Sequence, residues 1–287
     1  MVTLPSVTLP GSETLPSIGL GTWRMGESAS RRAADIAAVR SALDIGYRVI
    51  DTAEMYGEGG AETVVGQAIA DALRVGTLNR SELFIVSKVY PQNASAAGVA
   101  AACERSLKRL GLDHLDAYLL HWRGAVPLAE TVAGFESLRD RGRIRHWGVS
   151  NFDVDDLEEL VGTSCGDRCA VNQIYYSLTQ RGPAFDLLPW QAGRALPTMA
   201  YSPIDQGALV RSKPLLSLAE RRGVTPAQLA LAWLVDQPGV MAIPKAANEL
   251  HQRENLEALA VSLDASDRAA LDAAFAPPRR KSALAMI

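Results

Sequence analysis

Three short apolar runs in the first half of the chain each end on an ionisable side chain. The three groups are Asp51, Lys88 and His121, and Tyr56 follows Asp51 by five residues. Apolar runs of this length predict buried strands. Three successive strands would therefore each present a different ionisable group at one end. Each residue alone has a structural explanation, such as a turn cap or a solvated charge, but four at one end of a sheet indicate a site.

These four side-chain types can act together on an oxygen atom that gains negative charge. A free tyrosine titrates near about pH 10, and a nearby ammonium favours the phenolate and lowers that pKa. A buried carboxylate beside Lys88 would keep the ammonium charged and fixed, and His121 could donate a hydrogen bond to a carbonyl oxygen. The set suits protonation of an oxygen as hydride reaches its carbon. None of the four is a hydride source, so a cofactor is required.

The composition is that of an ordinary globular protein. The chain has 287 residues, of which 48% are hydrophobic and 21% charged, and its net charge is −3, which predicts no nucleic-acid partner. No apolar run approaches the roughly 18 residues that span a bilayer, and the N-terminus shows no secretory leader, so we expect a cytoplasmic protein without membrane contact. Three cysteines argue against a disulfide framework. Cys165 and Cys169 lack a second ligand pair, so we expect no metal.

Strand and helix patterns alternate along the chain. A short hairpin is predicted within residues 1–16, and helical patterns occupy 30–45, 61–73, 96–110, 128–141, 153–161, 185–194, 215–222, 225–237 and 248 onward. Core strands are predicted at 17–21, 49–51, 83–88, 113–120, 144–149, 170–173, 197–201 and 240–243. Eight strands alternating with helices predict an α/β fold, a (β/α)8 TIM barrel. We expect residues 1–287 to form one domain with a short C-terminal tail, 276–287.

An open, doubly wound sheet is the structural alternative, and it needs a phosphate-binding turn early in the chain. Gly19-Leu20-Gly21 could begin such a turn, but the third glycine position of the fingerprint is Arg24. In a closed barrel, the active site lies at the C-terminal ends of the strands. Asp51, Lys88 and His121 all stand at such ends, and adjacent strands lie about 4.8 Å apart. Their side chains can therefore meet over one mouth of the barrel.

Seven short motifs fall at these predicted strand ends. They are Gly19-Leu20-Gly21-Thr22-Trp23, the run 50–57, Val86-Ser87-Lys88, Leu120-His121-Trp122, the run 148–152, Tyr201-Ser202-Pro203 and Ile243-Pro244-Lys245. Together they make the chain resemble the aldo-keto reductases over about residues 19–255. The stretch 244–256 is similar to bacterial members that reduce methylglyoxal. The resemblance implies NADPH-dependent reduction of aldehydes and ketones to alcohols, by the tetrad Asp51, Tyr56, Lys88 and His121 with Tyr56 as general acid.

The resemblance also implies where the cofactor and the substrate lie. The nicotinamide carboxamide would be held by Ser150, Asn151 and Gln173, with Tyr201 stacked on the ring, and the loop 202–209 would cross the pyrophosphate. The implied cofactor-binding residues are Gly21, Thr22, Ser150, Asn151, Gln173, Tyr201, Ser202, Pro203, Ile204, Gln206, Gly207, Leu209, Lys245, His251, Arg253, Glu254 and Asn255. The residues expected to wall the substrate pocket are Trp23, Met25 and Trp122.

The adenosine end of the cofactor site can be argued from charge. Lys245 follows a predicted strand, and Asn248 begins a helix whose positive end would face the same place. This arrangement favours a ribose 2′-phosphate, and so NADPH over NADH. Many family members have a serine after the lysine and an arginine further on, where this chain has Ala246 and His251. The sequence leaves open whether Arg253 reaches around the helix to substitute.

Three functions are weighed from the sequence. The first is a carbonyl reductase, expected to be monomeric, that acts on small reactive aldehydes and dicarbonyls. Its short tail would close less of the barrel mouth, so a broad range of aldehydes is expected. The second is a cofactor-binding regulatory protein of the same fold with slow turnover. The third is a barrel enzyme of another class, such as a phosphate-sugar isomerase, against which the lack of a Gly-rich phosphate loop counts. Arg123 either attracts an anionic substrate or is a solvated surface charge.

Overall fold

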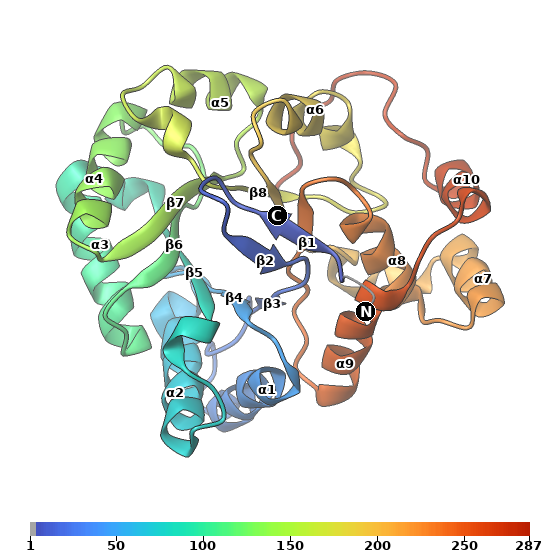
Figure 1. Ribbon diagram of the computed structural model, residues 1–287, viewed down its shortest axis with the longest axis horizontal. Coiled ribbons are helices and arrows are strands. Elements are labelled where there is room, and N and C mark those ends of the chain that lie inside the picture. Colours follow the sequence, from blue (N-terminus) through green and yellow to red (C-terminus); the bar gives the residue numbers. More distant parts are fainter. Residues whose placement is uncertain (1–3) are drawn as a thin grey trace.

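Eight parallel strands form the centre of the molecule, and helices surround them (Figure 1). The computed structural model describes residues 4–287, so the first three residues of the predicted hairpin segment lie outside it. The strands are β3 (Leu20–Gly21), β4 (Val49–Asp51), β5 (Phe84–Val89), β6 (Leu115–Leu120), β7 (Ile144–Ser150), β8 (Asn172–Tyr175), β9 (Thr198–Tyr201) and β10 (Val240–Ala242). They pair in sequence order.

Backbone hydrogen bonds close this sheet into a barrel. The Gly19 N–H donates to the carbonyl of Ala242 at 2.9 Å, and the Ala242 N–H donates to the carbonyl of Ser17 at 2.8 Å. These two bonds join β10 to the segment just before β3, so the first and last strands lie side by side. The predicted (β/α)8 barrel is therefore confirmed.

At least one α-helix follows each barrel strand. The helices are α1 (Arg32–Ile45), α2 (Gly60–Val75), α3 (Ala96–Leu110), α4 (Leu128–Asp140), α5 (Val154–Val161), α6 (Leu187–Ala192), α7 (Lys213–Arg222), α8 (Pro226–Val235), α9 (Glu249–Glu257) and α10 (Ala265–Ala274). The helical pattern from residue 248 onward is not one helix. It divides because Asp264 caps a new helix, accepting the backbone N–H groups of Ser266 and Asp267 at 2.8 and 2.9 Å.

Local sequence explains where a typical barrel helix begins and ends. In α3, the hydroxyl of Ser95 accepts the Gly98 N–H at 3.1 Å and so caps the first turn. Gly111 ends the helix with a φ of 66°, a left-handed conformation that glycine adopts without steric cost. Val99, Cys103 and Leu107 are buried against the rest of the core. Their spacing of four residues places them on one face of the helix.

An N-terminal hairpin covers one end of the barrel, as the sequence predicts. Its strands β1 (Ser6–Thr8) and β2 (Thr14–Pro16) pair antiparallel, and they cross the middle of the barrel in Figure 1. Val7 and Leu15 are buried in the same apolar cluster as Val49 and Phe84, the first residues of β4 and β5. The hairpin therefore closes the N-terminal ends of the strands, and the C-terminal ends are left for a site.

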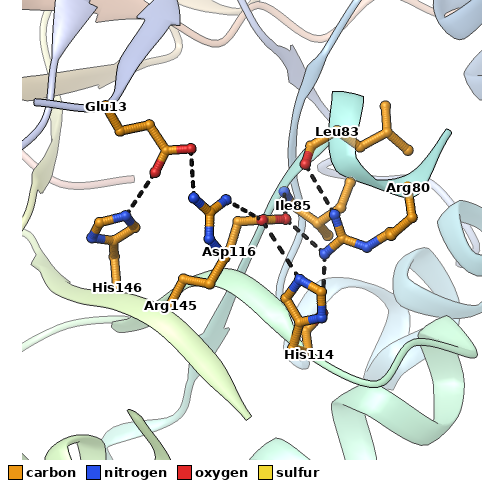
Figure 2. A network of polar contacts seen from close by, with 8 residues as sticks. All are labelled: Glu13, Arg80, Leu83, Ile85, His114, Asp116, Arg145 and His146. Carbon is orange, nitrogen blue, oxygen red and sulfur yellow. Dashed lines mark hydrogen bonds and ion pairs between the residues drawn. The ribbon is translucent and has the colours of Figure 1, made fainter. Parts of the chain in front are cut away.

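A network of charged side chains ties this hairpin to the barrel wall (Figure 2). Glu13, between β1 and β2, accepts hydrogen bonds from Arg145 and bonds His146, each at 2.8 Å. Arg145 also pairs at 2.8 Å with Asp116, a buried residue of β6. Asp116 further accepts from Arg80 at 2.7 Å and from a backbone N–H of β5 at 2.8 Å. The network lies at the end of the barrel opposite to the predicted site.

Candidate active site

The Lys88 ammonium holds three oxygen atoms together at the C-terminal ends of β4 and β5. Its Nζ donates to Asp51 Oδ2 at 2.8 Å, to the Thr52 carbonyl at 3.0 Å and to the Tyr56 hydroxyl at 3.0 Å. Three acceptors match the three N–H groups of an ammonium, and the side chain is fully buried. Strand register brings the group together, because Asp51 pairs with Val86 and Lys88, two residues on, points to the same face of the sheet.

The other predicted catalytic residue lies beside this cluster. His121 follows β6, and its backbone N–H donates to the Val89 carbonyl at 3.0 Å. Its imidazole meets the Tyr56 ring edge-on, with 5.7 Å between the ring centres. The other oxygen of the Asp51 carboxylate, Oδ1, accepts a hydrogen bond from Gln173 Nε2 at 2.7 Å. Asp51, Tyr56, Lys88 and His121 are therefore brought together at one end of the barrel.

Burial decides the protonation state of these groups. Burial raises the pKa of Tyr56 above its ordinary value and outweighs the opposing effect of Lys88. The ammonium does lower the pKa of this phenol, as expected, but its effect is smaller than that of burial, so the phenol stays protonated near neutrality. Burial, helped by Lys88, lowers the pKa of His121 well below 6.5, so its imidazole is neutral.

The Lys88–Asp51 pair balances burial against attraction. Burial alone lowers the pKa of Lys88, but Asp51 and Tyr56 together raise it. Burial raises the pKa of Asp51, whereas the Lys88 charge and the hydrogen bonds from Lys88 and Gln173 oppose that rise. A buried charge pair of this kind is stable only when its hydrogen bonds are complete. The bonds to Thr52, Tyr56 and Gln173 supply that completion.

A cavity of about 700 Å³ opens above these groups, a volume within the range of small-molecule sites. It runs along the C-terminal strand ends to the start of α9. The predicted residues that line it are Gly21, Trp23, Asp51, Tyr56, His121, Trp122, Ser150, Asn151, Gln173, Tyr201, Ser202, Pro203, Ile204, Gln206, Gly207, Lys245, His251, Glu254 and Asn255.

Several predicted residues lie away from the cavity surface. Lys88 lies beneath Tyr56, and Thr22 is buried with its hydroxyl donating to the Asp51 carbonyl at 2.9 Å. Met25 and Leu209 are buried in the hydrophobic core. Met25 is therefore not a wall of the substrate pocket in this structure, and Leu209 does not face the cavity, because both side chains are enclosed by apolar neighbours.

Arg253 also lies outside the cavity lining, although it was predicted to bind the cofactor. Its guanidinium donates to Glu249 Oε1 at 2.9 and 2.6 Å. This ion pair holds the arginine along the outer face of α9. Arg123, the other cation left open by the sequence, pairs with Glu159 at 2.8 Å, and it does not line the cavity. The structure thus favours a surface charge over an anion-binding role for Arg123.

The cavity includes residues that the sequence analysis did not assign to the cofactor or the substrate. They are Arg24, Met55, Val210, Leu216, Thr225, Pro226, Ala227, Ile243, Ala246, Met286 and Ile287. The Thr225-Pro226 helix start was visible in the sequence, and its place beside the cavity follows from the barrel. Met286 and Ile287 carry no such signal, because the tail has no periodic pattern. The last two residues of the tail thus contribute to the cavity wall.

Hydrogen bonds at the ends of β7 and β9 fix the residues predicted to hold a carboxamide. Ser150 Oγ donates to the Gln173 carbonyl at 2.8 Å, and the Tyr201 hydroxyl donates to Asn151 Oδ1 at 2.8 Å. Asn151 has a left-handed backbone, with a φ of 61°, which asparagine tolerates better than most residues. Amide groups and an aromatic ring therefore stand together beside the tetrad.

The two ends of the cavity differ in chemistry in a way that fits a phosphorylated dinucleotide. Tyr201 and the amide side chains stand at the tetrad end, and Lys245 and His251 stand at the α9 end. The first set suits an aromatic ring with a carboxamide, and the second suits a phosphate.

Within residues 4–287, the acidic, histidine and cysteine side chains form no cluster suited to a metal ion. In the same range, every helix is too short or too polar to cross a bilayer.

Comparison with known proteins agrees with a reductase of the barrel class. The family model described as "Aldo/keto reductase family" matches residues 17–276. The chain therefore belongs to the aldo/keto reductase family and is an oxidoreductase of that family. It is 45% identical over 286 residues to methylglyoxal reductase YeaE of Escherichia coli strain K12, covering 98% of each chain.

Two further comparisons extend this result. Methylglyoxal reductase DkgB of Salmonella typhi is 31% identical, with 91% of this chain and 93% of that protein covered. A solved structure of an aldo-keto reductase from Klebsiella pneumoniae in complex with NADPH is 47% identical and gives a TM-score of 0.94, covering 100% of both chains. Fold and family thus extend over essentially the whole chain.

Proposed function

We propose that this protein uses NADPH to reduce aldehydes and ketones to alcohols, with Tyr56 as the proton donor. We also propose that residues 1–287 form one domain. When bound, NADPH supplies the hydride that no side chain can provide. The observation that carries the proposal is the position of the Tyr56 hydroxyl, 3.0 Å from the buried ammonium of Lys88 and on the cavity wall. The K. pneumoniae relative, which binds NADPH, supports the choice of cofactor.

The tetrad residues would divide the work between them. The carbonyl oxygen would sit between the Tyr56 hydroxyl and the neutral His121 imidazole, which can donate a hydrogen bond. As the carbon gains a hydride, the C=O π bond breaks and its electron pair takes the Tyr56 proton, which leaves a phenolate beside Lys88. The ammonium, held by Asp51, would stabilise that phenolate electrostatically. Burial keeps the pKa of Tyr56 high, so the proton is present at neutral pH.

Small dicarbonyls such as methylglyoxal are the proposed substrates. Two relatives bear the name methylglyoxal reductase. The tetrad end of the cavity is walled by Trp23, Met55 and Trp122, and the tail adds Met286 and Ile287. Apolar walls with few polar groups bind a small carbonyl mainly by excluding water. We expect this pocket to accept several small aldehydes.

The direct test follows the absorbance of the reduced nicotinamide when methylglyoxal is added to the protein with NADPH or with NADH. We expect substrate-dependent oxidation, faster with NADPH than with NADH when the cofactor is limiting. Small aromatic aldehydes serve as further substrates. Tight NADPH binding without oxidation by any of these carbonyls would contradict the proposal and would favour the cofactor-binding regulatory protein instead.

A further inference from the structure

Glu54 is a buried carboxylate in the loop that carries Tyr56, and the proposed mechanism gives it no role. Its exposed fraction is 6%, and it lies between β4 and the short turn Tyr56–Gly59. Burying a carboxylate costs free energy unless hydrogen bonds or a cation compensate it. The partners of Glu54 therefore indicate what this carboxylate holds in place.

The Glu54 side chain bonds the segment that follows β5. Its Oε1 accepts the backbone N–H of Tyr90 at 2.9 Å and Asn93 Nδ2 at 3.0 Å. Its Oε2 lies 3.4 Å from Arg105 Nη2 of α3. Because β5 also delivers Lys88, the carboxylate fastens the Tyr56 loop to the strand that carries the ammonium.

The backbone of this loop gives Tyr56 little support of its own. The Glu54 N–H donates to the Lys88 carbonyl at 3.4 Å, which is long for a hydrogen bond. Residues 57–59, directly after Tyr56, all have left-handed φ values, between 51° and 85°. This conformation costs a non-glycine residue such as Glu58 free energy. The regular strand pairing therefore ends at Glu54, where the side-chain contacts begin.

Two attachments to one segment thus bracket the loop. The Tyr56 hydroxyl lies 3.0 Å from Lys88 Nζ, and the Glu54 carboxylate holds the backbone just beyond Lys88. Proton transfer depends steeply on position, and a misplacement of about 1 Å can cost about a hundredfold in rate. Losing the second attachment would leave the hydroxyl free to move relative to the ammonium and the carbonyl oxygen.

We propose that Glu54 is a positioning residue for the reduction, which holds the Tyr56 hydroxyl in place for proton transfer. The inference rests on the proposed function, in which Tyr56 is the proton donor. Among the residues that the structure describes, 4–287, Glu54 is not part of the cavity wall. It therefore acts through Tyr56, and its loss should lower kcat without weakening NADPH binding.

The test compares two replacements of Glu54. Glu54→Met keeps a side chain of similar length but removes both carboxylate oxygens, and it should lower kcat for methylglyoxal about tenfold. Glu54→Gln keeps one amide oxygen as an acceptor for the Tyr90 N–H and the Asn93 amide, and it should restore most of the rate. The NADPH dissociation constant, from fluorescence titration, should stay at the wild-type value in both.

A double variant shows whether Glu54 acts through Tyr56. In a Tyr56→Phe background there is no hydroxyl left to position, so adding Glu54→Met should change the residual rate by less than about twofold. If Glu54→Met does not fold, Asn93→Ala replaces it, because it removes only one donor to the carboxylate. Asn93→Ala should lower kcat about threefold, a smaller effect in the same direction.

Asp116→Asn is the matched control, because it alters a buried carboxylate at the opposite end of the barrel. It should destabilise the fold yet keep the wild-type kcat wherever circular dichroism shows the protein folded. The inference is overturned if Glu54→Met, or Asn93→Ala in its place, keeps the wild-type kcat. It is also overturned if Glu54→Gln is as slow as Glu54→Met, or if the losses multiply in the double variant. Absence of reduction by the wild type would instead overturn the proposed function.

Discussion

At the scale of single residues, the site combines a buried charge pair with two neutral groups. Lys88 and Asp51 are both almost completely buried, and Lys88 Nζ lies 2.8 Å from Asp51 Oδ2. Tyr56 and His121 are neutral because burial moves the pKa of the phenol up and that of the imidazole down. Within residues 4–287, the Nδ1 atom of His121 is a buried nitrogen without a hydrogen-bond partner. Protonating this buried imidazole would therefore destabilise the folded protein.

The first prediction concerns the pH dependence of folding. The folded pKa of His121 lies below its unfolded value of 6.5, so below about pH 6.5 the unfolded chain binds a proton that the folded chain excludes. The associated stability is present above that pH and is lost as the pH falls, by at most about 1.4 kcal/mol per pH unit. Urea unfolding between about pH 7 and pH 5 should show a steeper fall for the wild type than for His121→Gln. Parallel curves would show that the imidazole is not held neutral.

At the scale of elements, the loop after β9 is held in a strained conformation by one carboxylate. Ser202, Asp205 and Gln206 have φ values of 47°, 49° and 54°, which cost non-glycine residues free energy. The Asp205 carboxylate accepts hydrogen bonds from the Tyr175 hydroxyl at 3.0 Å and from the Ser177 hydroxyl at 2.6 Å, and it also bonds Thr179. These contacts fasten a loop that lines the cavity to the end of β8 and to the segment after it.

The second prediction is that Asp205→Ala weakens NADPH binding by about tenfold, because the loop must then be ordered when the cofactor binds. Tyr175→Phe removes one of the hydroxyl donors and should have a smaller effect in the same direction. Fluorescence titration with NADPH measures both. An unchanged dissociation constant for Asp205→Ala would mean that the carboxylate does not hold the loop in its binding conformation.

At the scale of the whole molecule, the two ends of the barrel are built differently. The N-terminal end is closed by the hairpin and by the network around Asp116, whereas the C-terminal end carries the cavity. Figure 2 shows Asp116 between Arg80 and Arg145, with Glu13 of the hairpin on the far side of Arg145. Removing the central carboxylate would leave the partly buried guanidinium of Arg80 and the exposed guanidinium of Arg145 without their shared partner.

The third prediction follows from this network. Asp116→Asn should lower the free energy of unfolding by about 2 to 4 kcal/mol, because a buried charge is removed from two arginines that stay charged, one of which, Arg80, is partly buried. Asp44→Asn is the matched control, since Asp44 pairs with Arg40 on the surface of α1 and should change stability by less than about 1 kcal/mol. Urea denaturation measures both variants. Equal effects would show that the network adds no more than a surface pair.

The sequence predicted the parts of the fold that follow local patterns. The barrel, the hairpin and the positions of Asp51, Lys88 and His121 at strand ends all depend on short-range periodicity. It could not predict contacts that depend on the path of the whole chain. Glu13 meets Arg145 across more than a hundred residues, and Met286 and Ile287 reach the cavity without any periodic signal. Met25 and Leu209 were misplaced because sequence position near a site does not reveal whether a side chain faces the cavity or the core.

The roles of the site residues depend on Tyr56 being the proton donor, and one variant tests this most directly. Tyr56→Phe should retain NADPH binding but lose carbonyl reduction by at least about a hundredfold, the scale of general acid catalysis. Tyr90→Phe is the control, because its hydroxyl contacts Glu58 at 3.3 Å rather than Lys88, and it should reduce methylglyoxal nearly as fast as the wild type. The measurement is the steady-state rate of methylglyoxal-dependent NADPH oxidation, together with NADPH affinity. Near-normal reduction by Tyr56→Phe would contradict the assignment.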